Sequence, residues 1–98
     1  MIVERRTYRT KHFSEHAMAD FCRQVWTQIE SPHPTIRTYV NISGPTNTVC
    51  QEFEFENWQE REQFWAGFWA LPQMSEWKER WVELADPGGS TEFFERVD

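Results

Sequence analysis

Three histidines are the residues of this sequence best suited to titrate near neutral pH or to ligate a metal: His12, His16 and His33. His12 and His16 are four residues apart, a spacing that would place both rings on one face of a helix. His12 precedes the expected helix start, however, so the two rings do not share a helical face. We therefore expect exposed structural histidines rather than a haem or metal ligand, and we assign no metal and no cofactor.

Nucleophilic and acid-base chemistry also lack a supporting pattern. Cys22 and Cys50 show no C-x-x-C or zinc-like spacing, and Cys22 falls on an apolar helical stripe, where burial raises a thiol pKa. Glu52, Glu54 and Glu56 alternate along one strand, which favours a charge-paired sheet face over a perturbed catalytic carboxylate. The sequence contains no Gly-x-Ser-x-Gly motif. We expect reduced structural thiols and assign no catalytic residue, which leaves enzymatic activity an open question.

Aromatic residues are dense in this chain, with six Trp and eight Phe. Each buries roughly 150–250 Å², so we expect some of them to line a cavity or an interface; a closed aromatic core is the alternative. A largely apolar pocket would suit a flat, hydrophobic small molecule. The candidate ligand-binding residues are Arg6, Tyr8, Trp65, Phe68, Trp69 and Trp77. Tyr39 and Asn41 are further candidate anchors, and Gly67 inside a helical stripe indicates close approach by another element or a ligand.

Alternation of side chains predicts four strands, over residues 1–9, 35–43, 48–56 and 90–97. A turn at 44–47 joins the second strand to the third as a hairpin, and Asp86-Pro87-Gly88-Gly89 is expected to be a turn before the last strand.

Apolar stripes predict the helices. The first opens at Ser14, an expected N-cap, with Phe13 and Met18 at the spacing of a hydrophobic staple, and the run Ser31-Pro32-His33-Pro34 stops it. Asn57 and Glu60 form a capping-box-like start for an aromatic helix that breaks at Leu71-Pro72. A further helical segment runs from Met74 to Leu84.

The resulting order, β-α-β-β-α-(α)-β, predicts an α+β fold: a ferredoxin-like antiparallel sheet with the first and third strands central and helices on one face. The charges agree with this arrangement. Acidic Glu52 and Glu54 on the third strand would lie between Arg5 on the first strand and Arg37 on the second. Neither face of the first strand is cleanly apolar, so either face could meet the helices.

Length and charge limit the class of protein. Residues 1–98 are expected to form a single domain. The net charge of −6, with Lys and Arg scattered, disfavours nucleic acid and anionic membrane surfaces as partners. Because no long apolar run or signal-peptide pattern occurs, we expect a cytoplasmic protein.

A sheet covered by helices on one side leaves its other side open. In this chain the open side would carry charges together with Phe, Tyr or Thr side chains, and a second copy would cover it. We expect a homodimer with sheet facing sheet.

Several short motifs occur in a fixed order along the whole chain: Arg6-x-Tyr8, Ser43-Gly44-Pro45-x-Asn47-Thr48, Glu60-Arg61-Glu62, and the break from Leu71-Pro72 to Trp77. This ordered set resembles NIPSNAP-like members of the dimeric α+β barrel superfamily, which includes small antibiotic-type monooxygenases. The resemblance implies a homodimer whose sheets form a barrel, with a pocket between each sheet and its own helices. It implies no agreed reaction.

Three hypotheses about function follow. The first is a NIPSNAP-like homodimer that binds a small apolar or aromatic compound between sheet and helices. The second is a cofactor-independent monooxygenase of the antibiotic-biosynthesis type, in which Trp and Tyr position an electron-rich substrate. The third is a purely structural or interaction module with a filled core.

Overall fold

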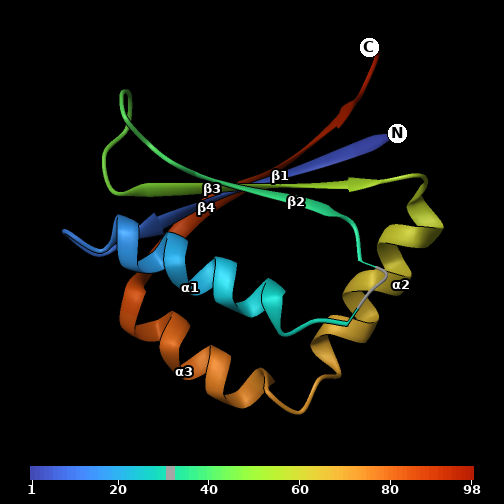
Figure 1. Ribbon diagram of the computed structural model, residues 1–98. Coiled ribbons are helices and arrows are strands. Elements are labelled where there is room, and N and C mark those ends of the chain that lie inside the picture. The colour runs from blue at the N-terminus through green and yellow to red at the C-terminus, as the bar shows by residue number, and fades with distance from the viewer. Residues whose placement is uncertain (31–32) are drawn as a thin grey trace.

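The computed structural model describes residues 1–30 and 33–98. In this part of the chain, a four-stranded sheet is covered on one face by three helices (Figure 1). The elements are β1 (Ile2–Thr10), α1 (Glu15–Thr27), β2 (Thr35–Val40), β3 (Thr48–Phe55), α2 (Trp58–Trp69), α3 (Met74–Leu84) and β4 (Ala85–Glu95). None of the described helices is long and apolar enough to cross a membrane.

The strand order is β2-β3-β1-β4, and every neighbouring pair is antiparallel. The prediction of a ferredoxin-like α+β sheet with the first and third strands central is therefore confirmed. In this register Arg5 lies directly opposite Glu52, which places the basic and acidic strands side by side as expected.

The structure decides which face of β1 meets the helices. Glu4 pairs with Phe53 and Tyr8 pairs with Val49 in the register, and both β3 partners are fully buried under the helices. Glu4 itself is fully buried. Apart from Ile2, the inner face of β1 therefore consists of Glu4, Arg6, Tyr8 and Thr10, a polar row for which burial without partners would be costly.

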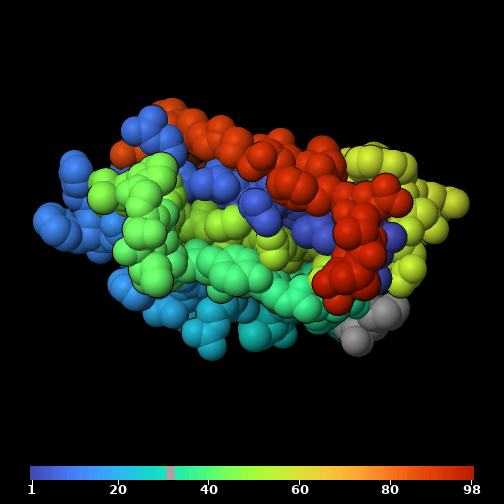
Figure 2. All heavy atoms as spheres, turned by 90° about the horizontal axis from the view of Figure 1, so that it is seen from above, coloured from blue at the N-terminus to red at the C-terminus, as the bar shows by residue number. Residues whose placement is uncertain are grey.

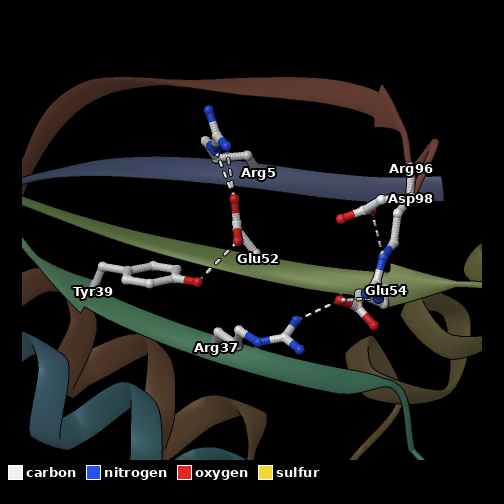
Figure 3. A network of polar contacts seen from close by, with 7 residues as sticks. All are labelled: Arg5, Arg37, Tyr39, Glu52, Glu54, Arg96 and Asp98. Carbon is white, nitrogen blue, oxygen red and sulfur yellow. Dashed lines mark hydrogen bonds and ion pairs between the residues drawn. The ribbon is translucent and has the colours of Figure 1, made fainter.

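The opposite face of the sheet is open and carries paired charges. Figure 2 views the molecule from above, with the β2–β3 hairpin loop and the C-terminal end at opposite ends of this face. Figure 3 shows that Glu52 accepts hydrogen bonds from Arg5 and Tyr39, and that Glu54 pairs with Arg37. The predicted charge-paired sheet face is confirmed for Glu52 and Glu54, whereas Glu56 lies beyond the end of β3.

The two predicted helix starts differ in outcome. The Asn57 side chain accepts a hydrogen bond from the Glu60 backbone N–H at 2.8 Å, so the predicted cap of α2 is confirmed. Ser14 occupies the N-cap position of α1 as predicted, but its hydroxyl donates to the His12 carbonyl and makes no cap bond to the helix. The Phe13 staple is wrong: its backbone has φ 63°, and its side chain is 97 % exposed rather than packed on Met18.

The expected turn at 86–89 is wrong, because these residues belong to β4. Gly88 and Gly89 have φ values of 108° and 117°, and the register of β4 against β1 shifts between Tyr8 and Thr10. Two left-handed glycines here make an irregular strand instead of reversing the chain. Pro87 is tolerated because β4 is an edge strand.

The first helix ends before its predicted stop. α1 ends at Thr27, with Gln28 as the C-cap residue. Part of the predicted stop, Ser31 and Pro32, lies outside the described residues. Beyond the break at Leu71-Pro72, α3 begins at Met74 as expected.

Within the described residues, three apolar clusters lie between the sheet and the helices. One gathers around Met18 and Val49, a second around Val25 and Trp77, and a third around Phe53 and Trp65. The second and third clusters share Trp26 and Phe68 as half-buried neighbours. The aromatic helices α2 and α3 therefore meet α1 in one continuous apolar layer.

Candidate functional site

A cavity of about 240 Å³ lies between the sheet and the helices. Its walls come from β1, β3 and all three described helices. The lining residues are Arg6, Tyr8, Phe21, Cys22, Val25, Trp26, Gln51, Trp65, Phe68, Trp69, Met74, Trp77, Lys78 and Trp81. The structure thus brings all six candidate ligand-binding residues together around one space.

Aromatic rings form most of the wall. Phe68 on α2 stacks on Trp77 on α3, with ring centroids 5.7 Å apart and planes 14° apart. Trp65 and Trp69 stack one helical turn apart on α2, and Tyr8 meets Trp81 edge-on at 4.8 Å. The break between α2 and α3 makes this arrangement possible, because one straight helix could not turn Phe68 and Trp77 toward each other.

A short hydrogen-bond chain lies beside the aromatic wall on the sheet. The Tyr8 hydroxyl donates to the Gln51 side-chain oxygen at 3.1 Å, and the Gln51 amide donates to the Thr38 hydroxyl at 3.1 Å. Gln51 is almost fully buried, so these bonds compensate for its loss of water. Burial raises the pKa of Tyr8, so the phenol stays neutral near pH 7.

A buried carboxylate, which the sequence analysis did not identify, holds Arg6 at the cavity. Glu4 accepts hydrogen bonds from Arg6 Nε at 2.7 Å, Arg61 Nε at 2.8 Å and Trp65 Nε1 at 3.0 Å. Burial by itself would raise the pKa of Glu4, but the hydrogen bonds from Arg61, Arg6 and Trp65 outweigh it and lower that pKa. The charged glutamate therefore positions two residues of the cavity wall, Arg6 and Trp65. Since Glu4 and Arg61 are 57 positions apart, no local pattern connects them.

Three expectations about the pocket are wrong. Tyr39 lies on the open face of the sheet, where its hydroxyl donates to Glu52 at 3.0 Å. Asn41 is exposed in the β2–β3 loop. A Cβ placed on Gly67 would meet nothing within 4 Å, so no element approaches this glycine. The prediction of a close approach at Gly67 is wrong because this residue faces solvent on α2.

Trp26 and Cys22 also line the cavity, although neither was predicted as a ligand-binding residue. Both lie on the apolar stripe of α1, and the cavity follows that stripe. Burial raises the pKa of the Cys22 thiol to about 12, which keeps it protonated and poorly nucleophilic. Cys22 and Cys50 are both free thiols, as expected.

The three histidines lie outside the cavity and are exposed. His12 is within 3.2 Å of the Asn47 side chain in a loop contact. Over residues 1–30 and 33–98, no three His, Cys, Asp or Glu side chains come together in a group that could hold a metal ion.

No known family model matches this sequence, and no curated protein sequence matches it. Solved structures do match. An uncharacterized NIPSNAP domain protein from Burkholderia xenovorans aligns with a TM-score of 0.82 and 20% identity, over 99% of this chain and 95% of that chain. The chain has the fold of NIPSNAP domain proteins.

Two further structures support this assignment of fold. A NIPSNAP family protein of unknown function from Agrobacterium tumefaciens aligns with a TM-score of 0.81 and 17% identity, over 99% of this chain and 88% of that chain. An antibiotic biosynthesis monooxygenase shares the fold more distantly, with a TM-score of 0.70 and 11% identity over 100% of both chains. The resemblance to NIPSNAP-like proteins and to this wider group is therefore confirmed for the fold.

Proposed function

We propose that this protein binds a small, flat, apolar or aromatic compound in the cavity between sheet and helices. The observation that carries the proposal is the cavity itself, whose wall combines stacked aromatic rings with a few fixed polar groups. Arg6 is held by Glu4, and Tyr8 by Gln51, so both polar groups are positioned before a ligand arrives. A filled aromatic core would leave no such space.

Two tryptophans on α2 offer a matched test of this proposal. Trp69 and Trp58 are each 53% exposed, but only Trp69 lines the cavity. We expect Trp69→Ala to weaken binding of a naphthalene-sized probe about tenfold, since a stacked aromatic contact contributes about 1 kcal/mol beyond its buried area. Trp58→Ala should bind like the wild type. Isothermal titration calorimetry measures both affinities. Equal affinities in the two variants would show that the probe does not bind in the cavity.

A cofactor-independent monooxygenase is the second candidate. The observation that favours it is the fold shared with an antibiotic biosynthesis monooxygenase over the full length of both chains. In such an enzyme the cavity would position an electron-rich substrate that itself reacts with oxygen. Oxygen uptake after addition of 1-naphthol, recorded with an electrode, tests this candidate. An oxygen-uptake rate equal to that of the heat-denatured protein would contradict the monooxygenase candidate and leave the proposed binding function standing.

We further propose that the protein is a homodimer that pairs through the open face of the sheet. That face holds a depression of about 420 Å³ whose lining includes Val3, Tyr39 and Phe94. Its carboxylates Glu52 and Glu54 already have arginine partners within the chain, which reduces the cost of covering them. Native mass spectrometry tests the assembly: twice the chain mass supports the dimer, and a monomer contradicts it.

A further inference from the structure

The two charged side chains that line the cavity are both cationic. They are Arg6 and Lys78, and among the described residues no Asp or Glu contributes to the lining. The whole chain has the opposite balance, with sixteen Asp and Glu against ten Lys and Arg. The positive character of the cavity is therefore a local property that runs against the net charge of the molecule.

Arg6 is positioned with donors to spare. Its Nε donates to Glu4, and its guanidinium lies 4.3 Å from the centre of the Trp65 ring. An arginine has five N–H donors, and the four on its terminal nitrogens have no acceptor within residues 1–30 and 33–98. Glu4 also accepts from Arg61, which has Glu62 as a second partner, so the terminal nitrogens of Arg6 are not needed to hold the buried carboxylate. A planar guanidinium with free terminal donors is suited to a carboxylate.

Lys78 is the second cation, on α3. It forms no ion pair within the described part of the chain, whereas the nearby Arg80 pairs with Glu83 at 2.7 Å. Lys78 is exposed, so its ammonium remains hydrated and adds attraction for an anion at the cavity without a desolvation cost.

The size of the cavity limits the apolar part of the ligand. A cavity of about 150 Å³ lined by apolar side chains holds one benzene molecule. The present cavity, at about 240 Å³, has room for one substituted ring or two fused rings.

We propose that the ligand is an aromatic carboxylate of one or two rings, with its ring against Phe68 and Trp77 and its carboxylate on Arg6. This inference rests on the proposed binding function, which by itself leaves the charge of the ligand open. Tyr8 is not the anion partner, because its proton is already donated to Gln51.

Isothermal titration calorimetry with 2-naphthoate and the nearly isosteric neutral 2-naphthamide tests the inference. We expect wild-type protein to bind naphthoate at least about tenfold more tightly than naphthamide, because the amide lacks the charge-assisted pairing with Arg6. Lys78→Gln should weaken naphthoate binding about threefold and leave naphthamide binding unchanged. Arg80→Gln removes the same charge from the same helix outside the cavity and should have no effect.

Arg6→Lys separates geometry from charge. It keeps a cation beside Glu4 but removes the planar fork, so naphthoate affinity should fall about tenfold while circular dichroism reports a folded protein.

Each other outcome contradicts a defined part of the proposal. Equal or tighter binding of naphthamide would overturn the carboxylate assignment and leave the binding function standing. Preference for naphthoate that survives both Lys78→Gln and Arg6→Lys would place the anion elsewhere. If neither probe binds, the proposed binding function fails, and the inference fails with it.

Discussion

At the scale of single residues, Glu4 determines how the interior is organised. It is fully buried, yet it stays charged because three donors converge on its two oxygens. Two of the donors belong to Arg6 and Trp65, which line the cavity. The residue that positions the candidate site is therefore outside the site.

Replacing Glu4 tests this role. Glu4→Gln removes the buried carboxylate that Arg6 and Arg61 share, and we expect the free energy of unfolding to fall by about 3 kcal/mol. Glu62→Gln is the matched control, because Glu62 binds the same Arg61 at 2.7 Å but from an exposed position. Its loss should cost under about 1 kcal/mol. Urea denaturation followed by circular dichroism measures both, and equal losses would contradict a special role for Glu4.

The lowered pKa of Glu4 also predicts a dependence of stability on pH. A carboxyl whose pKa is lower in the folded state contributes stability above its unfolded pKa of about 4.3. This contribution is lost as the pH falls through the folded value. We expect the urea concentration at the unfolding midpoint of the wild type to decrease once the pH is below about 4. The midpoint of Glu4→Gln should decrease less over the same pH range. Parallel pH profiles would show that other carboxylates dominate acid unfolding.

At the scale of elements, pairing with β1 determines the conformation of the first residues of β4, although their own composition predicts a turn. Asp86-Pro87-Gly88-Gly89 has the composition of a turn, but β1 pairs with β4 on both sides of the irregularity, at Ala85 and from Gly89 onward. Only glycine fits where the strand comes closest: a Cβ on Gly89 would lie 2.3 Å from the Thr7 carbonyl oxygen. The glycines therefore allow an irregular strand where a local interpretation predicts a reversal.

Two glycine-to-alanine variants should have opposite effects on stability. Gly89→Ala must accommodate both a positive φ and a backbone clash, and we expect a loss of about 2 kcal/mol or more. Gly67→Ala adds a methyl group in open space within α2, and we expect a gain of about 1 kcal/mol. Thermal unfolding of the two variants beside the wild type compares them directly. A neutral Gly89→Ala variant would contradict the close approach of β4 to β1.

At the scale of the whole molecule, the two faces of the sheet have different roles. The helices cover one face and enclose the cavity. The other face carries the ion pairs and the Tyr39 ring seen in Figure 3, together with the partly exposed ring of Phe94. A partner copy on the open face would leave the cavity on the helix side intact. The proposed dimerisation and the proposed ligand binding should therefore be separable by mutation.

A pair of apolar-to-charged substitutions tests the proposed dimer. Phe94 is 41% exposed on the open face, and Val82 is 67% exposed on α3. We expect Phe94→Glu to shift a dimer toward monomer, because it would bury an unpaired charge in the interface. Val82→Glu should leave the assembly unchanged. Sedimentation velocity distinguishes the species, and a dimer that survives Phe94→Glu would place the interface elsewhere.

The sequence by itself determined the order of the elements, the central positions of the first and third strands, the Asn57 cap and the six aromatic and polar candidates for the cavity. These follow from periodicity, local hydrogen bonding and charge, which act between residues close in the chain or on neighbouring strands. The tertiary structure decided which face of β1 turns inward, because two of the donors that stabilise buried Glu4, Arg61 and Trp65, come from a helix far along the chain. It also decided that 86–89 continues a strand, that Phe13 points to solvent, and that the aromatic rings leave a space between them. Each of these depends on packing between distant segments, which no local pattern encodes.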